Sequence, residues 1–276
     1  MRLIKQLGTV VVAALAGNLA MRLTGQNGAP ALLAGVATGV VALLAYRWVV
    51  GRTEHREPVE VGRDGASRSI GVGLLIGVGM FAVVIGAITV LGGYRIDGWG
   101  SAPGAAGLLG LAVAAGTTEE LLFRGVLFRI VEQRTGTWIA LLLTAVLFGG
   151  MHLLNPEATL WGAVAIAVEA GGMLGAAYAA TRRLWLPIGL HIGWNFAAGG
   201  VFGVTVSGTG ASTGLLRGVT SGPVVLSGGA FGPEASLFAV LAGLVMTIAF
   251  LVLAHRRGRL VARPGRGTPA RATVTV

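Results

Sequence analysis

The chain of 276 residues contains no cysteine. This absence excludes disulfide bonds, thiolate metal ligands and a cysteine nucleophile. Charged residues are also scarce, at 12% of the chain, and Lys5 is the only lysine. The net charge of +10 therefore rests on arginines, which cluster in short connecting segments and in the C-terminal tail. This distribution is typical of membrane topology and of contact with anionic membrane lipids, and it argues against nucleic-acid binding.

Long apolar runs make up most of the sequence, and 54% of the residues are hydrophobic. No soluble domain is visible. A transmembrane helix needs about 20 mainly apolar residues, and eight segments are candidates: 3–22, 30–50, 69–93, 105–131, 137–153, 158–181, 185–202 and 235–254. The sequence therefore predicts an all-α membrane protein with about eight transmembrane helices.

The connections between these segments alternate between arginine-rich and arginine-poor. The rich ones are 51–68, 129–136, the Arg182-Arg183 turn and the tail, and they share one side if the N-terminus is cytoplasmic. We therefore expect a multi-pass protein of the cell (plasma) membrane with both termini in the cytoplasm. The first residues resemble a signal peptide without a convincing cleavage site, so we expect a retained first span.

One apolar segment carries an unusual set of charges, Glu119, Glu120 and Arg124. Ionisable groups at membrane depth cost about 3 kcal/mol each on insertion scales and mark function. On a helix, Glu120 and Arg124 are spaced to pair, whereas Glu119 points about 100° away. Glu119 is left without a local partner and is a candidate general base.

Two further polar groups interrupt apolar segments. His152 lies near the end of the fifth segment, and His191 and Asn195 share one face of the seventh. A lone intramembrane histidine often forms a hydrogen bond that joins two helices. Two histidines, an asparagine and an unpaired glutamate instead favour a polar intramembrane catalytic cavity, although depth along the spans separates the histidines by roughly 10 Å.

These side chains suit hydrolysis in two ways. Glu119 could take a proton from water held by His152, while His191 and Asn195 donate to an oxyanion. Alternatively, Glu119, His152 and His191 could bind a divalent metal. The spacing does not decide between them, because the sequence has no His-Glu-x-x-His helix.

Three motifs in order, Glu-Glu-x-x-x-Arg at 119–124, Phe-x-x-x-His at 148–152 and His-x-x-x-Asn at 191–195, resemble those of the CPBP family. This family is also called the CAAX prenyl protease type II or Abi family. The resemblance covers about 105–200, and the Gly-rich region 221–236 is similar to an extension of bacterial members.

The resemblance implies an intramembrane endopeptidase acting on a membrane-associated or lipidated peptide or protein. Glu119 and His152 would activate water, His191 and Asn195 would stabilise the oxyanion, and Glu120 and Arg124 would support that centre. The resemblance leaves open whether the enzyme is a glutamic or a metallo-endopeptidase. No cofactor is certain, and Zn²⁺ on Glu119, His152 and His191 stays an alternative.

The sequence divides into four parts: N-terminal helices with a charged loop (1–104), the catalytic core (105–200), a Gly-rich loop with the last span (201–254), and a basic tail expected to be disordered (255–276). Within the third part, 203–234 is expected to be either disordered or a functional loop. Outside the motifs, Glu169 either faces the cavity or pairs with a neighbouring helix.

Two other functions compete with the protease. Buried Glu, His and Arg also serve proton-coupled transporters, although the chain lacks obvious inverted repeats. A non-catalytic membrane scaffold of the same fold is the other alternative. The Glu119→Gln variant separates the three, because only a protease loses peptide cleavage.

Overall fold

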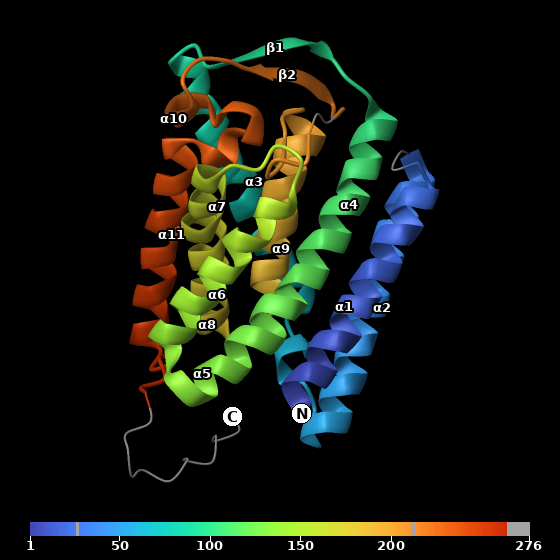
Figure 1. The fold of residues 1–276 in the computed structure, drawn as a ribbon, viewed down its shortest axis with the longest axis vertical. Helices are drawn as coiled ribbons and strands as arrows, with labels where there is room; N and C mark the ends of the chain where they lie inside the picture. The colour runs from blue at the N-terminus through green and yellow to red at the C-terminus, as the bar shows by residue number, and fades with distance from the viewer. Residues whose placement is uncertain (26–27, 211–212, 264–276) are drawn as a thin grey trace.

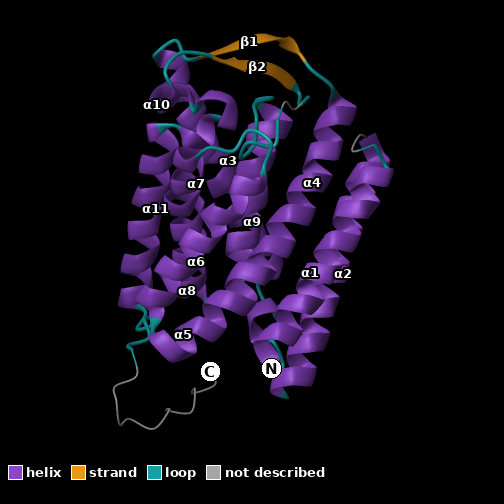
Figure 2. Ribbon diagram, viewed as in Figure 1, coloured by secondary structure: helices purple, strands orange, loops and turns teal. Residues whose placement is uncertain are grey.

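The computed structural model describes residues 1–25, 28–210 and 213–263. Helices form an upright bundle, and two short strands cross one end of it (Figure 1, Figure 2). The helices are α1 (Arg2–Leu23), α2 (Gly28–Glu54), α3 (Ala66–Val90), α4 (Ala102–Glu120), α5 (Arg129–Thr135), α6 (Thr137–Met151), α7 (Leu160–Ile166), α8 (Met173–Thr181), α9 (Trp185–Asn195), α10 (Val224–Ser227) and α11 (Leu237–Arg256). The strands are β1 (Tyr94–Trp99) and β2 (Leu216–Thr220).

Within the described residues, seven helices are long and apolar enough to cross a membrane. They are Arg2–Leu23, Gly28–Glu54, Ala66–Val90, Ala102–Thr135, Thr137–Leu154, Leu160–Thr181 and Leu237–Arg256, and they correspond to seven of the eight predicted spans. The remaining predicted span, 185–202, is helical from Trp185 to Val201 but is enclosed by the others, because nine consecutive residues from Leu186 are buried. The chain is an all-α, multi-pass membrane protein.

Glycines bring α9 against α3. A Cβ on Gly77 would collide with the carbonyl oxygen of Leu190, and a Cβ on Gly193 would collide with the backbone of Leu74. Small residues allow such close backbone approach at helix interfaces within membranes. This packing places α9, which carries His191 and Asn195, at the centre of the bundle.

Three helices pass through π-helical segments in the core region: η2 (Leu121–Phe128) after α4, η4 (Ala167–Gly172) between α7 and α8, and η5 (Phe196–Val201) after α9. Each of these segments contains or directly follows a polar residue singled out from the sequence. A π-helical turn inserts a residue into the α-helical repeat and is frequent at functional sites.

Ion pairs join the arginine-rich connections at the end of the bundle that holds Met1 (Figure 1). Arg129 contacts Glu54 at 2.8 Å, and Arg56 contacts both Glu54 at 2.7 Å and Glu60 at 2.8 Å. The hydroxyl of Tyr46 donates to the same Glu60 carboxylate. Connections that were expected to share one side therefore meet in space, and their assignment to the cytoplasm stays a prediction.

The first residues after α11 differ from the expected disordered tail. Arg259 donates to the carbonyl oxygen of Ala180 at 2.6 Å, and the backbone N–H of Val261 donates to the hydroxyl of Thr137 at 2.8 Å. The free carbonyl groups at the end of α8 provide acceptors that hold this segment down. The rest of the predicted tail, 264–276, lies outside the described residues.

The opposite end of the bundle is closed by the antiparallel pair β1 and β2, with Tyr94 opposite Thr220 and Trp99 opposite Leu216. The described parts of 203–234 also contain α10 and a short 3₁₀ turn, Gly229–Phe231. The disordered alternative for this stretch is therefore wrong for these residues. Its glycines allow tight backbone pairing, as where Gly214 accepts from the backbone N–H of Ser101 at 2.7 Å while a Cβ on Gly214 would collide with the carbonyl oxygen of Gly199.

Candidate active site

The first part of the site is a buried ion pair at the end of α4. Arg124 Nη1 contacts Glu120 Oε1 at 2.8 Å, and the two side chains are 1% and 0% exposed. The other terminal nitrogen of Arg124 donates to the carbonyl oxygens of Ala170 and Gly171 at 3.2 and 3.1 Å. The i,i+4 pair expected from the sequence is confirmed, and it also joins α4 to η4. A buried charge is tolerated at membrane depth when it has such partners.

Glu120 also orients His191. Its Oε1 lies 3.0 Å from Nδ1 of the imidazole. If the carboxylate is ionised, Nδ1 is the donor, so Nε2 is an acceptor in the neutral ring. Gly116, one turn before Glu120, allows α9 this close, since a Cβ there would lie 2.9 Å from Ile192 Cγ1.

Glu119 faces the free nitrogen of the same ring. Its Oε2 lies 3.9 Å from His191 Nε2, and no described residue gives this oxygen a hydrogen bond. One water molecule can donate a hydrogen bond to each of two acceptors 3.9 Å apart, because its oxygen can lie about 2.8 Å from both acceptor atoms. Glu119 is the less buried carboxylate, at 24% side-chain exposure, and this agrees with its expected lack of a local partner.

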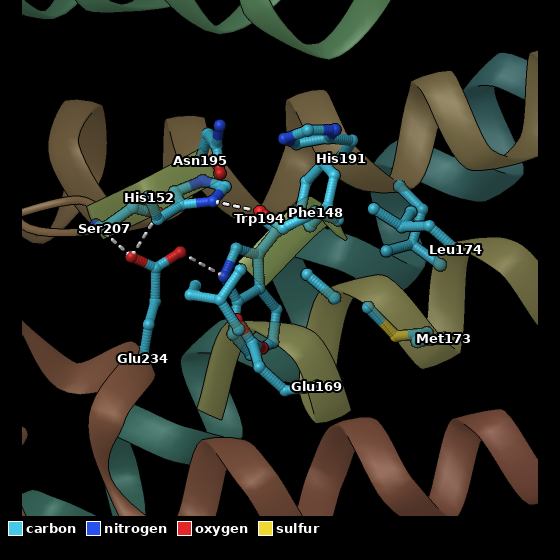
Figure 3. A pocket seen from close by; sticks show the side chains of 13 residues that line it. Phe148, His152, Glu169, Met173, Leu174, His191, Trp194, Asn195, Ser207 and Glu234 are labelled. Carbon is cyan, nitrogen blue, oxygen red and sulfur yellow. Dashed lines mark hydrogen bonds between the residues drawn. The ribbon is translucent and has the colours of Figure 1, made fainter. Parts of the chain in front are cut away.

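His152 ends α6 and contributes a second ring. Its Nδ1 lies 2.7 Å from the carbonyl oxygen of Phe148, four residues earlier. The Phe148 ring stands between the two histidines, with centroid distances of 5.0 Å to His152 and 6.0 Å to His191. The two histidines thus line one cavity together with Asn195 (Figure 3), and the depth difference counted along the spans does not keep them apart.

Glu119 and His152, however, make no hydrogen bond or ion pair with each other; the imidazole within 4 Å of the Glu119 carboxylate is that of His191. Likewise, the described residues contain no group of three or more His, Asp or Glu side chains placed to hold a metal ion. The set Glu119, His152 and His191 does not form a metal-binding geometry in this structure.

Glu234 is a cavity residue that the motifs did not identify. It is 1% exposed, and its carboxylate accepts from Trp194 Nε1 at 2.9 Å, from Ser207 Oγ at 3.0 Å and from the Ser207 backbone N–H. Burial raises the pKa of Glu234, although these donors oppose the shift. The signal available in the sequence was that Glu234 is the only acidic residue after Glu169.

Glu169 lies on η4 and lines the same cavity (Figure 3). Its side chain is 0% exposed, and neither carboxyl oxygen has a hydrogen-bonding partner among the described residues. Of the two expectations for Glu169, the structure supports the one in which it faces the cavity. No arginine of the described chain pairs with its carboxylate. Asn195, four residues after His191, also lines the cavity and makes no hydrogen bond with a described residue.

The sequence of this chain is similar to a known protein family. Residues 101–197 match the model of the family described as type II CAAX prenyl endopeptidase Rce1-like. The chain is also 26% identical over 174 residues to a Bacillus subtilis (strain 168) protein named "Putative membrane peptidase YdiL"; the match covers 58% of this chain and 66% of that protein. No solved structure matches the chain. The matched segment contains all six residues singled out by the three motifs.

Proposed function

Because residues 101–197 of this chain belong to the Rce1-like family of type II CAAX prenyl endopeptidases, we propose that the protein is an intramembrane endopeptidase with Glu119 as its general base. One observation carries this proposal: Oε2 of Glu119 and Nε2 of His191 lie 3.9 Å apart on packed helices within the membrane-spanning bundle. We place the attacking water molecule between these two groups.

In this mechanism the water oxygen attacks the carbonyl carbon of the peptide as Glu119 takes one of its protons. The proton then passes from Glu119 to the amine nitrogen as the C–N bond breaks. Arg124 and Glu120 fix the ring of His191, so that Nε2 stays aimed at the water. This assigns to His191 the water-holding role that the family resemblance gave to His152.

His152 and Asn195 act on the other side of the reacting carbonyl. Both line the cavity next to His191, where the amide N–H of Asn195 is a neutral donor for the developing oxyanion. His152 donates Nδ1–H to the carbonyl oxygen of Phe148, which leaves Nε2 without a proton in the neutral ring, and we assign it as a second proton-transfer group. No step passes through a metal ion, because the residues present do not gather into a metal site.

The test is cleavage of lipidated and unlipidated peptides by the purified protein in lipid nanodiscs. Glu119→Gln and His191→Ala should each lower kcat by at least about a hundredfold, as loss of a base or of its orienting partner does. The matched control is Glu157→Gln, the same change on an exposed loop residue, which should retain wild-type activity.

If the Glu119→Gln variant cleaved peptides at the wild-type rate, Glu119 would not be the general base. If the wild type cleaves no peptide, while proton flux through nanodiscs or liposomes changes in Glu119→Gln, the transporter alternative gains instead. Exhaustive chelation is a separate arm: we expect activity to persist, and loss that is restored by added Zn²⁺ would contradict a metal-free glutamate mechanism.

A further inference from the structure

The two cavities beside the catalytic residues differ greatly in size. The one lined by His152, Asn195 and Glu169 has a volume of about 10 Å³, and a cavity needs about 10–15 Å³ to hold one water molecule. It has room for a water or an oxyanion, and a peptide does not fit there. A substrate has to reach Glu119 from another direction.

That direction is a groove on the other side of Glu119, between α1, α2 and α4, with a volume of about 190 Å³. Glu119 forms part of its wall, and Met151, next to His152, lies at its edge. The remaining residues are Val10, Val11, Ala14, Leu15, Asn18, Thr38, Ala114, Ala115, Thr118 and Leu122. The outer rim is open, since Leu15 is 63% exposed, so this groove runs from the lipid-facing surface to the proposed base.

The polar atoms of the groove indicate what it binds. Thr38 and Thr118 are satisfied by their own helices, since their hydroxyls donate to Ala34 and Ala114 at 2.7 and 2.8 Å. The exposed amide of Asn18 lines the groove and makes no hydrogen bond with a described residue. Glu119 also lines the groove, although its unpaired Oε2, which faces His191, is itself buried. The groove therefore offers an apolar wall with one free amide and with the side chain of the proposed base.

A hydrocarbon chain in this groove would leave the Asn18 amide without a hydrogen-bonding partner. An extended peptide would not, because every backbone N–H and C=O at membrane depth needs a partner. The amide of Asn18 can both donate to and accept from such a backbone. The apolar walls suit small and branched side chains, and Glu119 forms part of the wall that such a peptide would contact.

We propose that the groove between α1 and α4 binds an extended, apolar, unlipidated peptide segment of a membrane-embedded substrate, with Asn18 pairing with its backbone. This inference rests on the proposed function and adds a substrate class and an entry route to it. Half of the twelve wall residues belong to α1 and α2, outside residues 101–197, so the groove extends beyond the matched family segment.

The first experiment fills the groove. Ala14→Trp places a large ring in the groove, whereas Val12→Trp places the same ring on the lipid-facing side of α1, where Val12 is 66% exposed and does not line the groove. Cleavage of unlipidated apolar peptides should fall at least about tenfold in Ala14→Trp, because access to the base is blocked, and stay at the wild-type value in Val12→Trp. Equal activity in both variants would overturn the proposal while leaving the protease intact.

The second experiment does not depend on cleavage. Because the native sequence has no cysteine, a maleimide labels only the introduced one. Ala14→Cys and Val12→Cys proteins in nanodiscs are labelled with a lipid-soluble maleimide, with and without a short synthetic peptide of Leu, Ala and Val. A saturating peptide should slow labelling of Ala14→Cys about tenfold or more and leave Val12→Cys unchanged. An N-myristoylated polar peptide and added phospholipid serve as competing probes.

Protection of Ala14→Cys by the myristoylated peptide or by phospholipid alone would overturn the proposal in favour of a hydrocarbon-binding groove. Protection by none of the probes would overturn it as well. Protection by the apolar peptide without any cleavage would support the groove and count against the proposed protease, so the two failures are distinguishable.

Discussion

The indole nitrogen of Trp194 donates to the carboxylate of Glu234 at 2.9 Å, and this contact attaches the segment before α11 to the helix that carries His191 and Asn195. The two residues are 40 positions apart. The segment before α11 is thus bonded to α9 three residues from His191, a proposed catalytic residue.

Trp194→Phe keeps the aromatic packing of this contact, including the edge-to-face stacking on Phe81, but removes the hydrogen bond. When a buried carboxylate loses one hydrogen-bond donor, the free energy of unfolding falls by about 1–3 kcal/mol. We therefore expect a lower thermal midpoint and faster proteolysis of 203–236. Unchanged proteolysis of that segment would show that the bond does not hold it.

Gly116 sets the separation of α4 from α9, so Gly116→Ala tests how closely the site is positioned. The new Cβ would lie 2.9 Å from Ile192 and 3.6 Å from the Cβ of His191, and a displacement approaching 1 Å can cost about a hundredfold in rate. We expect cleavage to fall substantially while the fold persists. Gly79→Ala is the control, since a Cβ there meets nothing within 4 Å; equal activity of the two variants would contradict this role.

The Glu120–Arg124 pair should reveal itself through a double-mutant cycle. Arg124→Met leaves Glu120 buried with only His191 as partner, and breaking a buried pair costs about 3–5 kcal/mol. Adding Glu120→Leu removes the stranded charge, so the double variant should recover much of the unfolding stability without recovering cleavage. Measured by thermal unfolding and peptide turnover, additive stability losses would contradict the pairing.

Acid should weaken the end of the bundle that holds Met1 through Glu60. Burial alone would raise the pKa of Glu60, but hydrogen bonds from Arg56 and the charge of Arg129 outweigh it and lower that pKa. Glu60 therefore contributes stability that is complete above the unfolded-state pKa of about 4.3 and is lost as pH falls through the lower folded-state value.

The measurement is the thermal midpoint from pH 8 downward. Wild type should lose stability below about pH 4, where the unfolded chain takes up protons first, and Glu60→Gln should be less stable at neutral pH with a smaller acid-dependent loss. Glu57→Gln, the same change on an exposed neighbour, should follow the wild type. Identical pH curves for Glu60→Gln and wild type would contradict the assignment.

Short-range patterns predicted much of this molecule. The apolar runs located seven spans, and i,i+4 spacing located the Glu120–Arg124 pair, because helical periodicity acts within a few residues. The order of Glu119, His152 and His191 along the chain did not reveal which of them meet. Packing of α9 against α3 and α4 decides that His191, and not His152, faces Glu119.

Contacts between residues far apart in the sequence could not be predicted, for a different reason. The segment around Glu234 contains a helix-start pattern and nothing that identifies Trp194 or Ser207 as its partners. The pairing of β1 with β2 was equally hidden, since Tyr94 and Thr220 lie in glycine-rich surroundings without strict alternation. Both contacts depend on the assembled bundle and not on local sequence.

The distance in sequence between β1 and β2 has a consequence for how the protein is made. The helices that carry the proposed catalytic residues all emerge from the ribosome between these two strands, and Glu234 emerges later still. Neither the strand pair nor the Trp194 contact can form during synthesis of these helices, so residues from β2 onward complete the proposed site after its other residues are already in the membrane. Nascent chains that stop before residue 234 are therefore expected to be inactive, which confines any peptide cleavage to finished molecules.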